Sequence, residues 1–293
     1  MNLELALLER KEHFESYLKS MLQGPQSPLR FLGQNSAPIE ILKNSAHYSL
    51  LNGGKRFRPV LCLLLAESFA VSPKRILPVA LAIEMVHTYS LIHDDLPSMD
   101  NSDLRRGQPT NHKKFGEAVA LLAGDTLLTE CFGVLTQEYS EDPQLVRDLV
   151  ALLVECIGLR GMIGGQIQDL SAQKGGFTKE QLLEMHQLKT GALIKACCQM
   201  TARTCGLPTG KIDQAEKFGA ALGLAFQIAD DLLDSVDSYE PHSFVALLGK
   251  EGTRQYLDQV SEEAVEALIK LGLNSSRDPL LFAMVDYNRN RGH

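Results

Sequence analysis

The chain of 293 residues lacks a Cys-x-x-Cys pair, although it contains six cysteines. All six lie in apolar segments with helical spacing, which is typical of reduced core residues and not of a disulfide framework or a zinc site. They are Cys62, Cys131, Cys156, Cys197, Cys198 and Cys205. This use of cysteine predicts a cytoplasmic protein.

Common nucleotide-binding and hydrolase signatures are also missing. The sequence has no Walker loop, no Gly-x-Gly-x-x-Gly motif and no Ser-His-Asp spacing. Its net charge of −7 argues against a nucleic-acid partner and against a polybasic membrane anchor. A site for an anionic ligand must therefore concentrate its positive charge locally or take it from metal ions.

Long hydrophobic runs are absent as well. The longest ones, such as VLCLLLA from Val60, are far shorter than the roughly 18 residues that span a bilayer. The N-terminal stretch MNLELALLERKEHFESYLKSML is charged throughout and amphipathic, which is not the pattern of a signal peptide. We therefore expect a soluble protein without stable membrane insertion.

Alternating strand patterns are not found, whereas almost every periodic segment has the spacing of a helix. A hydrophobic content of 44% in a chain of this length is enough for a sizeable core, in one large domain or two. We predict an all-α fold. The expected helices are 3–22, 37–51, 56–70, 73–96, 113–139, 143–170, 179–205, 210–236, 253–271 and 279–290.

Three of these helices have unusual composition. Helix 113–139 is apolar nearly all round, so it should be central in a bundle or lie against another subunit. Glycines in 143–170 predict close packing or a kink, since each costs about 1 kcal/mol relative to alanine. They are Gly158, Gly161, Gly164 and Gly165. Lys189-Thr190-Gly191 is expected to interrupt helix 179–205 in the same way.

The stretch from Glu84 to Thr110 carries acidic and then basic side chains. They include Asp94, Asp95, Asp100, Arg105 and Arg106. Pro97 and the polar run after it do not extend a helix well, which places the paired aspartates at a helix C-terminus. The helix dipole repels anions there, so the carboxylates require a cation. Hard oxygen ligands beside arginines indicate Mg²⁺ shared with a phosphate, the alternative being a solvated acidic loop.

A second acidic cluster lies inside the predicted helix 210–236. Asp230 and Asp234 are one turn apart and share a face, with Asp231 alongside. Like charges at this spacing repel one another, so this helix also requires a cation. Two such clusters, each after an apolar turn, are difficult to explain as chance solvation.

Basic side chains are placed to meet anions at several points. Gly53 and Gly54 precede Lys55 and Arg58 beside a helix N-terminus, where free N–H groups and the dipole favour an anion. The alternative is an ordinary basic surface turn. With Arg105, Arg106 and Lys189, these cations suit two diphosphates, one of them bridged by Mg²⁺. Apolar neighbours such as Phe226, Ile228, Tyr89 and Leu91 would line a cavity for an apolar tail, and metal-assisted departure of diphosphate is the chemistry open to it.

Six segments resemble, in order, the motifs of bacterial trans-isoprenyl diphosphate synthases. They are GGKRFRP, SLIHDDLPSMDNSDLRRGQPTNH, FGEAVALLAGDTLL, GGQIQDL, HQLKTGALI and GLAFQIADDLLD. The resemblance is greatest to the farnesyl diphosphate synthases among them. It implies one helical domain over residues 1–293 around a central cavity, and a homodimer. It also implies condensation of isopentenyl diphosphate with dimethylallyl or geranyl diphosphate to give farnesyl diphosphate.

The same resemblance assigns roles by position. Mg²⁺, as three ions with the allylic diphosphate bound, would be held by Asp94, Asp95, Asp100, Asp230, Asp231 and Asp234. Arg105 and Lys189 match positions that touch the allylic diphosphate. The isopentenyl diphosphate site would be Lys55, Arg58, His87 and Arg106. Thr190 and Gln227 match groups that face the developing cation. His87 lies seven residues before Asp94, so both project from one helix face.

Tyr89 is the candidate determinant of product length. It lies five residues before Asp94, about 7.5 Å back along a helix, where a growing chain must pass. The resemblance agrees, because an aromatic residue there, with two extra residues in the motif, goes with C15 products. The alternative is that Tyr89 is a core residue with its hydroxyl satisfied elsewhere.

One departure from the family pattern follows Asp234. Members of the family usually carry a longer loop with a lysine that helps to hold the allylic diphosphate, whereas here only the short connection 235–241, SVDSYEP, is present. Either the loop is short or a segment is omitted. A non-catalytic partner subunit is therefore an alternative, as are a class I terpene cyclase and a synthase of geranyl or geranylgeranyl diphosphate.

Overall fold

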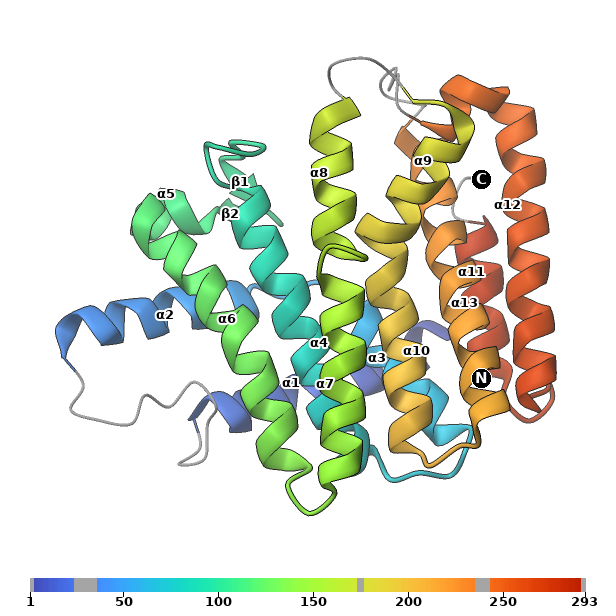
Figure 1. The fold of residues 1–293 in the computed structure, drawn as a ribbon, viewed down its shortest axis with the longest axis horizontal. Coiled ribbons are helices and arrows are strands. Elements are labelled where there is room, and N and C mark those ends of the chain that lie inside the picture. Colours follow the sequence, from blue (N-terminus) through green and yellow to red (C-terminus); the bar gives the residue numbers. More distant parts are fainter. Residues whose placement is uncertain (1–2, 24–35, 173–176, 235–242, 291–293) are drawn as a thin grey trace. The chain divides into compact units, whose positions relative to one another are not determined.

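The protein is described by a computed structural model that covers residues 3–23, 36–172, 177–234 and 243–290. Within these ranges the chain is helical apart from one short antiparallel pair of strands, which confirms the all-α class (Figure 1). It divides into two compact units. Of the described residues, 3–23, 36–63 and 74–146 belong to the N-terminal unit, and 64–73, 147–172, 177–234 and 243–290 belong to the C-terminal unit. One domain over residues 1–293 remains a prediction.

The N-terminal unit contains the helix that carries the first aspartates. Its elements are α1 (Leu3–Gln23), α2 (Ala37–Leu51), most of α3 (Phe57–Glu67), α4 (Pro73–Asp94), β1 (Leu104–Arg105), β2 (Gln108–Pro109), α5 (Asn111–Phe115) and α6 (Glu117–Glu138). Every residue of α4 from Ile76 to Val86 is buried, as expected of a helix that is apolar on all faces. The helix ends at Asp94, two residues before the predicted end at residue 96, and the paired aspartates lie at its C-terminus as predicted.

The predicted helix 113–139 is two helices. Gly116 has a φ of +87°, a left-handed conformation that glycine adopts without strain, and it separates α5 from α6. Leu121 and Leu122 on α6 are 46% and 52% exposed. The helices that the structure describes therefore do not cover α6 on every side. The alternative of a contact with another subunit stays a prediction.

The strand pair was not predicted. Leu104 pairs with Pro109 and Arg105 with Gln108, so Arg106 and Gly107 form the turn. Both have positive φ, 54° and 75°, as a tight two-residue hairpin turn requires. The Arg-Arg-Gly motif thus lies at the end of a hairpin.

The C-terminal unit contains the second acidic cluster. Its elements are most of α7 (Pro143–Ile157), α8 (Met162–Ala172), α9 (Lys179–His186), the π-helix η1 (Gln187–Gly191), α10 (Ala192–Thr204), α11 (Thr209–Asp234), α12 (Phe244–Leu271) and α13 (Pro279–Asn290). Helix α11 packs between α10 and α12 (Figure 1). α12 begins earlier than the predicted residue 253 and is kinked at Gly249, whose φ is +70°.

Glycines have the two structural effects that were predicted. The predicted helix 143–170 breaks between α7 and α8, where a Cβ on Gly161 would lie 1.9 Å from the carbonyl oxygen of Cys156. A Cβ on Gly165 would lie 2.2 Å from the backbone nitrogen of Lys189, so α8 packs closely on η1. The π-helix is the interruption expected at Lys189–Gly191.

Three stretches of the described chain are long and apolar enough to cross a membrane by length and composition alone. They are Pro73–Asp94, Glu117–Glu138 and Pro143–Ser171. The shortness of the uninterrupted apolar runs is therefore not a sufficient argument against membrane-spanning helices in this chain. Sparse polar residues interrupt the runs, but the helices remain apolar on average. In Pro73–Asp94, 78% of the apolar window is buried inside the protein. The absence of membrane insertion stays a prediction.

Candidate active site

The first acidic cluster is built on the C-terminal end of α4. The chain folds back after Asp94. The carbonyl oxygen of Asp94 accepts a hydrogen bond from the backbone N–H of Asp100 at 2.9 Å. This bond brings residues 94 and 100 together at the negative end of the helix dipole. Asp94 is half-buried and Asp100 is exposed.

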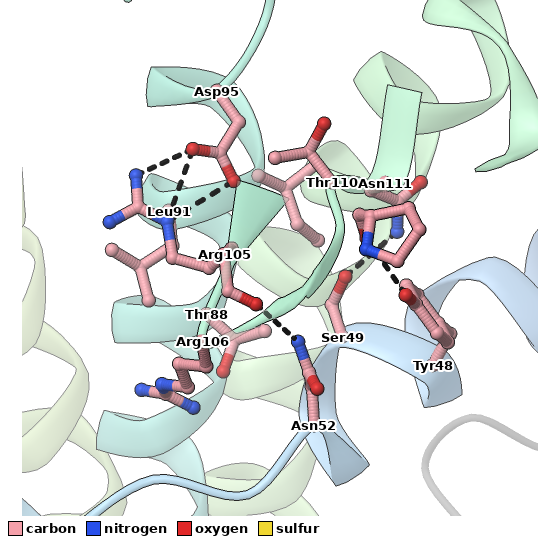
Figure 2. A pocket seen from close by; sticks show the side chains of 12 residues that line it. Tyr48, Ser49, Asn52, Thr88, Leu91, Asp95, Arg105, Arg106, Thr110 and Asn111 are labelled. Carbon is pink, nitrogen blue, oxygen red and sulfur yellow. Dashed lines mark hydrogen bonds and ion pairs between the residues drawn. The ribbon is translucent and has the colours of Figure 1, made fainter. Parts of the chain in front are cut away.

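Asp95 forms an ion pair with a cationic side chain of the protein, Arg105. Its carboxylate is 3% exposed and accepts hydrogen bonds from Arg105 Nη2 at 2.5 Å and Arg105 Nε at 3.1 Å (Figure 2). The bond to Asp95 raises the pKa of Arg105 despite its partial burial. This bidentate pair fixes the hairpin that carries the two arginines to the end of α4.

Helix α2 holds the same hairpin from another side. Asn52 donates to the carbonyl oxygen of Arg105 at 3.3 Å, and the Tyr48 hydroxyl donates to that of Pro109 at 2.8 Å (Figure 2). The guanidinium of Arg106 donates to the carbonyl oxygen of Gly53. A Cβ on Gly54 would lie 2.5 Å from Arg106 Cζ, so only glycine permits this approach.

His87 is half-buried on α4, and the charges of several arginines act on its ring. Burial, followed by the charges of Arg58, Arg106, Arg56 and Arg105, lowers the pKa of His87 well below its usual value. The imidazole is therefore neutral at pH 7 and can donate a hydrogen bond without adding to the positive charge. The structure thus brings three residues predicted for the isopentenyl diphosphate site together, namely Arg58, His87 and Arg106, while Lys55 is exposed nearby in sequence.

Tyr89 is buried on α4, with its ring edge-to-face against His93 at 5.7 Å. Its hydroxyl has no hydrogen-bond partner among the residues that the structure describes. Burial, with smaller contributions from Cys131 and Asp94, raises the pKa of this hydroxyl above its usual value. The described residues therefore do not support the alternative in which Tyr89 is a core residue whose hydroxyl is hydrogen-bonded within the core.

The second acidic cluster lies at the end of α11. Asp231 is 5% exposed, and its Oδ2 accepts the backbone N–H of Phe244 at 2.7 Å. His186 Nε2 lies 4.0 Å from the same oxygen, and its ring stacks on Phe244. Asp230 is half-buried and Asp234 is exposed. Asp231 is thus engaged by the chain, as Asp95 is in the other unit.

The π-helix places two more of the predicted residues. Lys189 Nζ donates to Asp169 Oδ2 on α8 at 2.6 Å, and Thr190 Oγ1 donates to Gln227 Oε1 on α11 at 3.0 Å. The wider turn of a π-helix brings both side chains to neighbouring helices, and such segments are frequent at functional sites. Thr190 and Gln227, predicted to act together, are in contact.

The sequence model of the family described as "Polyprenyl synthetase" matches residues 39–243. The chain belongs to the polyprenyl synthetase family. The farnesyl diphosphate synthase of Bacillus subtilis is 41% identical over 267 residues, which are 86% of this chain and 89% of that protein. The large subunit 1 of a heterodimeric geranylgeranyl pyrophosphate synthase of Arabidopsis thaliana is 39% identical over 269 residues, 85% of this chain and 72% of that one. The crystal structure of a geranyltransferase from Legionella pneumophila has a TM-score of 0.87 at 34% identity, with 99% of this chain and 97% of that chain covered.

Whether this polyprenyl synthetase can hold Mg²⁺ depends on its donor set. No group of three or more His, Cys, Asp or Glu side chains gathers into a metal site within the described ranges. Each unit instead offers exposed or half-buried carboxylates, Asp94 with Asp100 and Asp230 with Asp234. Mg²⁺ keeps several waters and binds through one or two carboxylates plus substrate phosphates. The oxygen-only donor set therefore fits this ion.

Sequence reasoning missed one residue of the site. Asp169 lies in the glycine-rich segment 143–170, for which only close packing or a kink was predicted, and the structure pairs it with Lys189. An aspartate that follows the glycines of GGQIQDL by a few residues was the available signal. The predicted consequence of the short connection 235–241 concerns residues that lie outside the described ranges.

Proposed function

We propose that this polyprenyl synthetase is a Mg²⁺-dependent prenyltransferase that condenses isopentenyl diphosphate with dimethylallyl or geranyl diphosphate and forms farnesyl diphosphate. The observation that carries the proposal is that each unit places carboxylates beside a cation held by the protein. These cations are Arg105, held by Asp95, and Lys189, held by Asp169. Two protein cations and two carboxylate pairs match what an allylic diphosphate bound with Mg²⁺ requires.

The proposed residues have three different roles, namely holding the metal, binding the diphosphate and positioning other side chains. Asp94, Asp100, Asp230 and Asp234 hold Mg²⁺ on the allylic diphosphate. Bound Mg²⁺ supplies Lewis-acid stabilisation of the departing diphosphate. Arg105 and Lys189 bind the same group by charge-assisted hydrogen bonds. We assign Asp95 and Asp231 chiefly to positioning, because both are buried and engaged by the chain.

The isopentenyl diphosphate is proposed to lie on Lys55, Arg58, His87 and Arg106, with neutral His87 donating one hydrogen bond. The C–O bond of the allylic substrate breaks and leaves an allylic cation, which the oxygens of Thr190 and Gln227 stabilise. The double bond of isopentenyl diphosphate attacks this cation and forms the new C–C bond. A proton then leaves to an oxygen of the released diphosphate, so no protein base is required.

The remaining expectations are part of the same proposal. Three Mg²⁺ ions, a cytoplasmic location and a homodimer go with it. Family membership favours prenyl transfer over the terpene cyclase alternative. A geranylgeranyl product is the second candidate, because a relative at 39% identity carries that name.

Steady-state turnover tests the proposal. The purified chain is incubated with Mg²⁺, isopentenyl diphosphate and geranyl diphosphate, and inorganic diphosphate release is followed together with product identity. We expect release that requires both substrates and stops when the metal is chelated. Diphosphate release without isopentenyl diphosphate would support a cyclase, and no release at all would support a non-catalytic partner subunit.

A further inference from the structure

A buried ion pair lies next to the basic loop between α2 and α3. Arg56 Nη1 and Glu84 Oε1 are 2.6 Å apart, and their side chains are 1% and 2% exposed. Glu84 is in the middle of the apolar part of α4. A charge so deeply buried is costly unless it is paired and hydrogen-bonded, so a pair retained here calls for a reason.

The guanidinium of Arg56 joins three helices. Besides the bond to Glu84 on α4, Nη2 donates to the carbonyl oxygen of Leu50 at 2.6 Å. Leu50 is in the last turn of α2, where carbonyl oxygens have no partner within the helix. Arg56 Nε also donates to Glu15 on α1 at 3.4 Å. Arg56 therefore fixes the loop to a rigid frame.

The backbone of Arg56 is held in an unfavourable conformation. Its φ is +51°, in the left-handed region that side chains other than those of glycine, asparagine and aspartate seldom adopt. Such a conformation persists only where the surroundings determine it. The contacts of the guanidinium provide this constraint. The backbone at residue 56 sets the direction of Lys55 in the loop and of Arg58 in the first turn of α3.

The position of Glu84 on α4 relates the pair to the ligand groups. Glu84 precedes His87 by about one helical turn, so both lie on one face of α4. Arg56 and Arg58 both act electrostatically on the His87 ring. Anchoring Arg56 at Glu84 therefore brings the loop to the level of His87, where the proposed isopentenyl diphosphate site is assembled.

We propose that Glu84, acting through Arg56, is a positioning residue that sets the geometry of Lys55 and Arg58 for isopentenyl diphosphate. This inference depends on the proposed function, because it concerns the binding of one of its two substrates. A purely electrostatic role would have the opposite effect. Glu84 is the acidic neighbour of a group of arginines, so removal of its charge would then strengthen diphosphate binding.

The test is the KM of each substrate in Glu84→Gln. We expect the KM for isopentenyl diphosphate to rise about 10- to 100-fold, the loss typical of misplaced binding groups, while the KM for geranyl diphosphate changes less than about twofold. Glu15→Gln is the matched control, since Glu15 contacts the same guanidinium from a more exposed position, 27% against 2%. That variant should resemble the wild type.

If Glu84→Gln does not fold, the double variant Arg56→Met with Glu84→Leu takes its place, because apolar replacement of a buried ion pair is often tolerated. It should fold and show the same selective rise in KM. A lower KM for isopentenyl diphosphate, equal changes for both substrates, or no change would overturn the positioning role. Wild-type protein without turnover would instead overturn the proposed function, and the two failures are thus distinct.

Discussion

At the scale of single residues, the carboxylates of the two acidic clusters are not equivalent. Asp95 and Asp231 are buried and accept hydrogen bonds from the chain. Other members, such as Asp100 and Asp234, are exposed. A divalent cation that retains waters is bound by accessible oxygens. The burial pattern therefore separates candidate ligands from residues that shape the site.

The accessible aspartates should be essential for turnover. Asp94→Ala, Asp100→Ala and Asp230→Ala are each expected to lower kcat by orders of magnitude, because metal-held charge stabilisation contributes several kcal/mol and each 1.4 kcal/mol is about tenfold. Circular dichroism should show normally folded protein. Asp103→Ala is the control, since Asp103 is exposed and pairs with Lys113 on the surface, at 2.7 Å. Near-normal turnover in two of the three variants would contradict the metal assignment.

Tyr89 should limit product length through its ring and not its hydroxyl. Tyr89→Ala removes the ring and is expected to give products longer than C15, detected by chromatography of the dephosphorylated prenols. Tyr89→Phe should leave the product length unchanged, because the hydroxyl has no hydrogen-bond partner among the described residues. An unchanged length distribution in Tyr89→Ala would show that another residue stops the chain.

At the scale of elements, the geometry around the π-helix depends on the close approach of α8. Gly165→Ala should destabilise the fold by about 1–3 kcal/mol, as overpacking does, and raise the KM for the allylic substrate. The reason is that the new methyl group would lie 2.2 Å from the backbone nitrogen of Lys189. Urea unfolding and steady-state kinetics measure the two effects. Gly210→Ala on α11 is the control, because nothing lies within 4 Å of its Cβ position. Equal stability of the two variants would refute the close-packing explanation.

The helices were largely predictable because apolar periodicity is a local property. The placement of the paired aspartates at the C-terminus of α4 followed from Pro97 and the polar run after it, and the interruption at Lys189 followed from Thr190-Gly191. The split at Gly116 was missed because one glycine between Phe115 and the apolar run that begins at Ala118 does not by itself interrupt the helical spacing. The Arg106-Gly107 hairpin was missed because its strands are too short to show alternation.

The pairing of site residues was less accessible from sequence. Family motifs indicated which side chains belong together, and the contact of Thr190 with Gln227 agrees with them. The bond from Arg105 to Asp95 depends instead on how the hairpin folds back on the end of α4. The bond from Lys189 to Asp169 depends on which helix faces meet. Tertiary packing determines which elements come into contact, and the spacing of residues along one helix does not predict these contacts.

At the scale of the whole molecule, α6 leaves apolar side chains exposed that a second copy of the chain would cover. We expect light scattering to give twice the chain mass of 32.3 kDa. Leu121→Asp combined with Leu122→Asp should shift the protein to the monomer, because both side chains are about half exposed on α6. Leu247→Asp, at a similarly exposed leucine on α12, is the control. A monomeric wild type would contradict the predicted homodimer.

The most direct test of the central claim is the product formed from the shortest substrates. Wild-type protein with Mg²⁺, dimethylallyl diphosphate and labelled isopentenyl diphosphate is followed over time, and the prenols are separated by length after dephosphorylation. The account predicts that a C10 product appears first and is converted to C15, which then accumulates as the main product. A main product of C20 would contradict the farnesyl assignment, and an absence of labelled prenol with folded protein and Mg²⁺ would contradict prenyl transfer itself.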